Sequence, residues 1–76
     1  MSNDLPIREA QILERLEQGG DVAIGDLLST IGVEPRDPKR DQSYIGVYIT
    51  FLNRRLGGRR IVPGEIKRTY RLTQTA

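Results

Sequence analysis

Basic side chains concentrated in the second part of the chain are the main candidates for chemistry. Residues 34–76 hold ten Lys and Arg against four Asp and Glu, a net charge of +6, whereas residues 1–33 hold two against six, a net charge of −4. Such an uneven distribution gives a folded molecule one positive face. The chemistry that this face favours is electrostatic binding of a polyanion.

Catalytic and metal chemistry has few candidate residues. The chain contains no cysteine and no histidine. Their absence excludes a disulfide, a thiol nucleophile and a zinc site built on thiolates, and it removes the usual general base of serine and cysteine nucleophiles. Only carboxylates and lysines remain for catalysis, and no motif pairs two carboxylates in a recognisable site. We expect a protein that is not an enzyme and that binds no metal and no cofactor.

The length and the hydrophobic pattern predict one small domain. A chain of 76 residues supports a single core with little room for a deep internal pocket. The longest apolar run, residues 44–52, is about half of the ~20 residues that a membrane-spanning helix needs. The N-terminus has no basic region followed by an apolar segment. We therefore expect a cytoplasmic protein with no membrane partner.

Three segments have the apolar spacing of amphipathic helices, each followed by glycine. They are expected over about residues 6–18, 24–31 and 42–56. A short extended piece at residues 22–23 precedes the second helix. The charged, proline-containing residues 33–41 predict a loop, and Asp41 at its end is a candidate N-cap for the third helix.

The last segment has the pattern of a β-hairpin, expected over residues 59–73. From residue 66 onward the side chains alternate at a period of two, as in a half-buried strand, and Pro63 and Gly64 predict the turn before it. A helix-turn-helix followed by a two-stranded wing is an α+β arrangement. The sequence predicts a winged helix-turn-helix with three helices and a C-terminal β-hairpin wing, as a single domain over residues 1–76.

The third helix has two sides that differ in kind. Ile45, Ile49 and Leu52 form the stripe that a helix lays on a core. The opposite side is too apolar for a solvated face and too mixed for a second core. It carries Ser43, Val47, Thr50 and Arg54, flanked by Gly46 and Phe51. We expect this side to contact a partner.

The residues that carry these features resemble a known family. The run IGVYITFLNRRL at residues 45–56 and the later YRL at residues 70–72 are similar to the V-D-V-H-I-x-x-L-R-x-K-L and closing G-Y-R-L patterns of OmpR/PhoB-type winged-helix response-regulator output domains. The resemblance spans residues 5–72 and is to the output domain without its receiver domain. Asn53 stands where the family usually has Arg, and Thr69 where it has the glycine before the wing tyrosine, which leaves Lys67 and Arg68 as an alternative turn.

The resemblance implies that the third helix enters the DNA major groove, where each base pair displays a distinct pattern of donors, acceptors and methyl groups. Val47 and Thr50 are then candidates to contact thymine methyl groups. Arg54 is a candidate to bond guanine bidentately, a contact that gives ~1–3 kcal/mol of discrimination. Gly46 would allow close approach of the helix to its partner.

The candidate DNA-binding residues fall into three groups. The recognition helix would contribute Ser43, Tyr44, Gly46, Val47, Thr50, Phe51, Arg54 and Arg55. The wing would contact the backbone or minor groove through Arg59, Arg60, Lys67, Arg68 and Arg71. The loop before the third helix would add Arg36, Lys39 and Arg40.

These expectations describe a bacterial or phage transcription regulator that binds double-stranded DNA and is nucleoid-associated when bound. It would be a monomer in solution that dimerises or binds in tandem on DNA, with RNA polymerase or another regulator as a further partner. The alternative is a winged-helix protein–protein interaction module of a transcription complex, in which Val47 and Phe51 dock a protein.

Structural interpretations of the same residues also remain open. Arg54 and Arg55 stabilise the C-terminal end of a helix dipole without any ligand. The cations of residues 36–40 alternate with acidic residues, as in a solvated loop. The aromatic residues Tyr44, Tyr48, Phe51 and Tyr70 suit the margin of a core.

Overall fold

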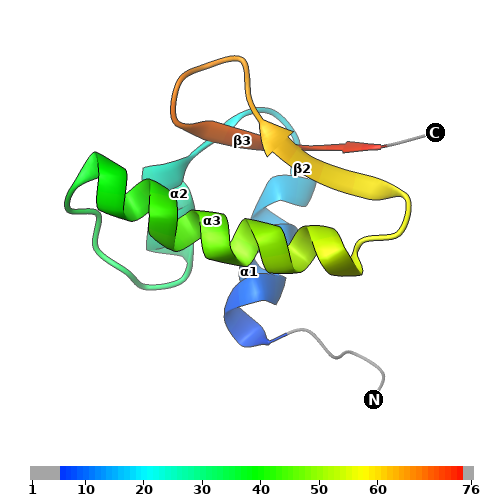
Figure 1. Ribbon diagram of the computed structural model, residues 1–76, viewed down its shortest axis with the longest axis horizontal. Helices are drawn as coiled ribbons and strands as arrows, with labels where there is room; N and C mark the ends of the chain where they lie inside the picture. The colour runs from blue at the N-terminus through cyan, green and yellow to red at the C-terminus, as the bar shows by residue number, and fades with distance from the viewer. Residues whose placement is uncertain (1–5, 75–76) are drawn as a thin grey trace.

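The computed structural model describes residues 6–74. Along the chain it contains α1 (Ile7–Glu17), β1 (Val22–Ala23), α2 (Ile24–Thr30), α3 (Pro38–Arg55), β2 (Arg59–Pro63) and β3 (Thr69–Gln74). The strands form one antiparallel sheet in the order β1-β3-β2. Figure 1 shows the hairpin of β2 and β3 above α3. This is the predicted α+β winged helix with a C-terminal hairpin. Leu5, where the family resemblance begins, and the outermost residues of the predicted domain lie outside the described residues.

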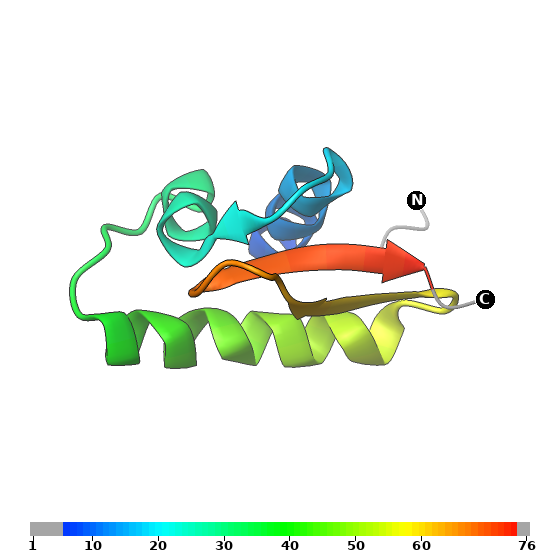
Figure 2. The same ribbon diagram turned by 90° about the horizontal axis from the view of Figure 1, so that it is seen from above.

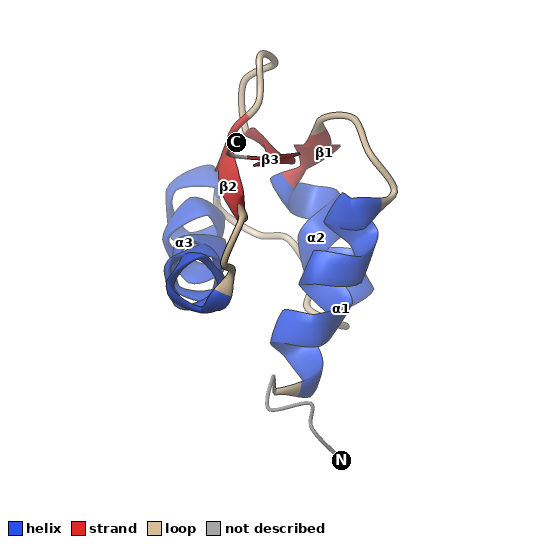
Figure 3. Cartoon of the chain, turned by 90° about the vertical axis from the view of Figure 1, so that its right-hand side faces the viewer, coloured by secondary structure: helices blue, strands red, loops and turns tan. Residues whose placement is uncertain are grey.

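The sheet closes one side of a three-helix cluster. Seen from above, β2 and β3 run between α3 and the pair α1 and α2 (Figure 2). Figure 3 shows β2 beside α3 and β1 next to α2. Every element except β3 contributes to a core of buried apolar side chains. These are Ile12, Leu13, Leu16, Val22, Ile24, Leu27, Leu28, Ile31, Ile45, Ile49, Leu52 and Ile61.

The first two helices end at glycines that adopt the left-handed conformation. Gly19 follows α1 with φ 95°. After α2, Gly32 has φ 78°, its N–H donates to Ser29 O at 3.1 Å, and the N–H of Val33 donates to Leu28 O at 2.8 Å. These two bonds form a Schellman motif, which satisfies carbonyls that the helix end leaves unpaired. The positions of both helices agree with the apolar spacing.

The third helix begins at Pro38, not near residue 42 as predicted. Asp37 is its N-cap, because its carboxylate accepts a hydrogen bond from Arg40 N at 3.2 Å, and proline suits the first turn that follows. The predicted N-cap, Asp41, instead lies inside the helix and is buried. Its Oδ2 accepts from Arg36 N at 2.9 Å. The loop is therefore shorter than expected, and Lys39 and Arg40 belong to α3.

The wing turn contains Gly64 of the predicted Pro63–Gly64 turn and both residues of the alternative Lys67–Arg68 turn, whereas Pro63 is the last residue of β2. The paired strands extend from Arg59 opposite Gln74 to Pro63 opposite Tyr70, which leaves residues 64–68 as the connection. Lys67 and Arg68 therefore lie in the turn and not on a strand. The extended piece predicted at residues 22–23 is β1, which pairs with the start of β3 through Val22 opposite Tyr70.

Candidate nucleic-acid interface

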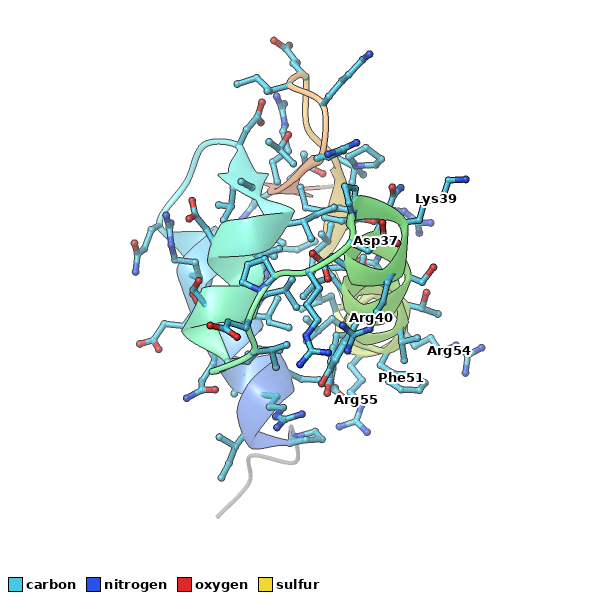
Figure 4. All side chains as sticks on the ribbon, turned by 90° about the vertical axis from the view of Figure 1, so that its left-hand side faces the viewer. Asp37, Lys39, Arg40, Phe51, Arg54 and Arg55 are labelled. Carbon is cyan, nitrogen blue, oxygen red and sulfur yellow. The ribbon has the colours of Figure 1, made fainter. Side chains whose placement is uncertain are left out.

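The side of α3 opposite the core forms an exposed surface that we call the outer face. It consists of Arg40, Ser43, Val47, Thr50, Phe51 and Arg54, all exposed. Val47 is 51% exposed and Phe51 43%. Figure 4 shows Arg54 and Phe51 directed away from the body of the protein. Of the recognition residues predicted on this side, Gly46 and Tyr44 lie on its two flanks and are half-buried.

The charge of α3 is almost entirely positive. The helix carries Lys39, Arg40, Arg54 and Arg55, all exposed. Its single acidic residue is Asp41, which is 8% exposed and bonded to a backbone N–H of the preceding loop. The outer face itself contains no carboxylate, so a polyanion can approach it without meeting a like charge.

The flank of α3 nearer the wing is fixed to the hairpin by Asn53. The side-chain Nδ2 of Asn53 donates to Ile61 O at 3.0 Å, and its Oδ1 accepts from Ile61 N at 2.8 Å. Gln42, closer to the start of α3, lines a hollow with residues of the wing turn. The wing is therefore held at a set position beside α3, with Gly46 on the same flank.

The other flank of α3 faces α1 and carries two stacked tyrosines. The rings of Tyr44 and Tyr48 lie 5.6 Å apart with 25° between their planes. Arg8 Nη1 of α1 donates to both hydroxyls, at 3.0 Å to Tyr44 and 3.4 Å to Tyr48. The hydrogen bond from Arg8 lowers the pKa of Tyr48, and the same bond raises the pKa of Arg8. Tyr44 is therefore engaged within the protein at the margin of the outer face.

An apolar hollow opens between this flank and the outer face. It has a volume of about 520 Å³ and is lined by Arg40, Ser43, Tyr44, Val47, Tyr48 and Phe51. Val47 and Phe51 are among the few large apolar side chains that the described residues leave exposed. The hollow is open to solvent, and its only charged lining residue is basic.

The wing turn is held in one conformation by Asp21. The carboxylate Oδ2 of Asp21 accepts from the N–H groups of Glu65 at 3.0 Å and Ile66 at 3.3 Å. A Cβ on Gly64 would lie 2.7 Å from this carboxylate and would overlap Thr69 Oγ1, so the turn requires glycine there. These contacts hold the turn in place. The cations at its tip, Lys67 and Arg68, therefore extend from a preorganised turn.

Arg68 occupies a strained position at this tip. It has φ 60° and is the one non-glycine residue with positive φ among those described. Its carbonyl accepts a hydrogen bond from Ile24 N at 2.9 Å, which ties the turn to the start of α2. Strain of this kind persists only where the surrounding contacts determine the conformation, and it occurs often at functional positions.

The wing tip and the loop before α3 contribute to one basic hollow. Arg36, Lys67 and Arg68 line it together with Asp41, and all three cations are exposed. The sequence placed Arg36 and the wing cations in separate groups, and the fold brings them together. The hollow has a volume of about 330 Å³.

The remaining wing cations are placed differently. Arg59 Nη1 donates to Glu17 Oε2 of α1 at 2.8 Å, so Arg59 joins the wing to α1. Arg71 lies 4.0 Å from Glu65, a weak and exposed pair. Arg60 is exposed on β2 and remains available to a ligand.

Four residues that shape this interface were not among the predicted sites: Arg8, Asp21, Asn53 and Gly64. Asn53 differs from the Arg that the family usually has at its position, and Gly64 was recognised as a turn residue only. The sequence contains no signal for the role of Asp21 or Arg8, because their partners lie far away along the chain.

The comparisons with known proteins gave no match: the chain matches no protein-family model, no curated protein and no solved structure. Within residues 6–74, no helix has both the length and the apolar character needed to cross a membrane. Over the same part of the chain, no three acidic side chains gather in a cluster that could hold a metal ion.

Proposed function

We propose that this domain binds double-stranded DNA sequence-specifically and acts as a transcription regulator, with α3 in the major groove and the wing on the backbone or minor groove. The proposal extends the OmpR/PhoB-type resemblance, and with it a cytoplasmic location. The observation that carries it is the outer face of α3, which is exposed and contains no carboxylate. A protein approaching the phosphate backbone requires such a face.

The composition of the outer face suits contact with base edges. Its small and apolar side chains, Val47 and Thr50, can lie against thymine methyl groups. Arg54 extends from the same face (Figure 4) and can reach the two acceptors of guanine. The helix α3 has 18 residues and is therefore about 27 Å long. One part of this length is enough to lie in a major groove.

The wing supplies contacts that do not depend on sequence. Lys67 and Arg68 extend from a turn that Asp21 and Gly64 hold in place. Because Asn53 fixes β2 to α3, a duplex seated on the outer face would meet the wing in a defined register. Phosphate contacts of this type position a protein on DNA and supply much of its affinity.

A salt titration tests the proposal. If the domain neutralises about four to six phosphates, a plot of log K against log salt concentration should have a slope of roughly −4 to −5. The duplexes would come from selection out of a random pool, with a scrambled duplex as the control. A flat titration, or equal affinity for selected and scrambled duplexes, would contradict sequence-specific DNA binding.

A single reading helix covers few bases, so we also propose that strong sites contain two half-sites about one helical turn apart. Direct repeats are the arrangement that the OmpR/PhoB-type resemblance implies. The domain would be a monomer in solution that binds in tandem on DNA, with RNA polymerase or another regulator as a further partner. Footprints that show full affinity on one isolated half-site would contradict tandem binding.

A further inference from the structure

The apolar hollow on the α1 flank of α3 has features that DNA reading does not require. Its walls are aromatic and aliphatic, formed by Tyr44, Tyr48, Phe51 and Val47. The hydroxyls of both tyrosines are already bonded to Arg8, so they are not free to bond base edges. An exposed apolar hollow with a polar rim is typical of a protein-binding surface.

The hollow is preformed. Arg8 holds both tyrosine hydroxyls, and the rings stack with their centroids 5.6 Å apart. Tyr48 also packs against the core, so the wall cannot collapse inward. A partner that binds here would therefore lose little free energy in ordering the site.

The hollow lies on the side of α3 away from the wing. Asn53 marks the wing flank through its bonds to β2, and Tyr44 and Tyr48 mark the opposite flank through their bonds to α1. Figure 4 shows the same division, with the wing at the top and Phe51 and Arg55 on the lower side of α3. A duplex seated on the outer face would cover the hollow, because four of the six lining residues also belong to that face: Arg40, Ser43, Val47 and Phe51.

The charge around the hollow defines its occupant. Arg40 lines it and Arg8 lies at its inner edge, while Glu9, the nearby carboxylate that influences Tyr48, is buried at 5% exposure. A second copy of this chain is a poor fit. Of its other exposed large apolar residues, Ile7 is followed by the cation Arg8, and Ile66 lies between Glu65 and Lys67, so neither brings the net negative charge that the basic rim favours.

We infer that the hollow docks an acidic amphipathic helix of another protein, which competes with DNA for the outer face; the competition, but not the docking, rests on the proposed function. Large apolar side chains of that helix would enter the hollow between Val47 and Phe51, and its carboxylates would pair with Arg40 and Arg8. Helix-in-groove recognition of this kind uses apolar anchors at helical spacing. Such a protein would release the domain from its DNA site.

Peptide selection tests the inference. The intact chain is immobilised and used to select from a random library of peptides of about 15 residues, long enough for a short helix. We expect enriched peptides to combine several carboxylates with large apolar residues spaced three or four apart. Phe51→Ser and Arg40→Glu should each weaken binding of a selected peptide about tenfold or more, as expected for an anchor at the centre of an interface.

Two controls make the result specific. Lys67→Ala, in the wing, should leave peptide affinity unchanged, and thermal unfolding should show that each variant is folded.

Selection of basic or uncharged peptides, or peptide binding that is insensitive to Phe51→Ser, would overturn the inference. A saturating duplex should displace the peptide, and peptide that stays bound alongside the duplex would overturn the competition for the outer face. If wild-type protein binds peptide but no duplex, the DNA proposal fails and peptide docking by the hollow stands.

Discussion

The side-chain amide of Asn53 bonds both backbone groups of Ile61. Nδ2 donates to the carbonyl at 3.0 Å and Oδ1 accepts from the N–H at 2.8 Å. Ile61 lies at the centre of β2, which is an edge strand of the sheet, so these groups have no neighbouring strand to pair with. Asn53 thus takes the place of a strand partner and fixes the distance between the proposed recognition helix and the wing.

Asn53→Ala should lower the free energy of unfolding by ~1–3 kcal/mol, because it leaves a buried donor and a buried acceptor of Ile61 unpaired. Asn53→Asp should also destabilise the fold, since a carboxylate can accept from Ile61 N but cannot donate to Ile61 O. Urea denaturation measures both effects. Gln42→Ala, at an exposed position of the same helix, is the control, and an equal loss in this variant would contradict a special role for Asn53.

Gly64→Ala should destabilise the wing turn. The new Cβ would lie 2.7 Å from the Asp21 carboxylate and would overlap Thr69 Oγ1, and overpacking of this kind costs ~1–3 kcal/mol. Gly58→Ala is a matched control, because a Cβ there has no neighbouring atom within 4 Å. Unfolding curves and amide spectra of the wing would show the difference. Similar behaviour of the two variants would mean that the turn adapts without cost.

Arg68→Gly should raise stability and weaken DNA binding together. Arg68 has φ 60°, a conformation that costs a side-chain-bearing residue ~1–2 kcal/mol and glycine almost nothing. Arg68→Ala keeps the strain and removes the charge, so it should weaken binding without the gain in stability. Thermal unfolding and duplex titration on both variants separate the effects. Undiminished affinity in Arg68→Gly would show that the Arg68 side chain does not contact DNA.

Arg54 and Arg68 should differ in the kind of binding they support. Arg54→Ala should cost ~1–3 kcal/mol on the preferred duplex and relax the preference at one base pair. Arg68→Ala should lower affinity on all duplexes and reduce the salt slope by about one. Titrations on cognate and scrambled duplexes at several salt concentrations test both expectations. Equal weakening of both duplexes by Arg54→Ala would show that Arg54 does not read bases.

Arg8→Ala should raise the pKa of Tyr48. The hydrogen bond from Arg8 is the main cause that lowers this pKa below its ordinary value of 10.0, because it favours the charged tyrosinate. In the wild type, ionisation of Tyr48 therefore adds stability that is fully present above the unfolded pKa and is lost as the pH falls through the folded pKa. An alkaline titration of the tyrosine ring carbons by NMR would follow it. An unchanged Tyr48 pKa in Arg8→Ala would contradict this coupling.

The sequence by itself determined where most elements lie. Apolar spacing at the helical period located the three helices, and alternation in the last segment located the hairpin, because both patterns reflect backbone geometry over neighbouring residues. The core stripe of Ile45, Ile49 and Leu52 followed from the same periodicity and is buried. The two sides of α3 were therefore recognisable before its surroundings were known.

The start of α3 was misassigned for a local reason. Two aspartates, Asp37 and Asp41, can each cap a helix, and the spacing of apolar residues favoured the later one. The structure uses Asp37, followed by Pro38, and gives Asp41 a buried role beneath the loop. Which of two equivalent caps is used depends on whether the alternative carboxylate has a partner elsewhere, here the N–H of Arg36.

Only the tertiary structure decided which polar groups meet. Asp21 reaches the wing turn, Arg59 pairs with Glu17, and Arg8 bonds the tyrosines of α3, and the partners in each case lie 36 or more residues apart. No local periodicity records such pairings, because they depend on how helices and strands pack around the core. For the same reason the sequence counted Arg59 and Lys67 as equivalent wing cations. The fold gives Arg59 a carboxylate partner on α1 and leaves Lys67 exposed on the wing turn beside Arg36.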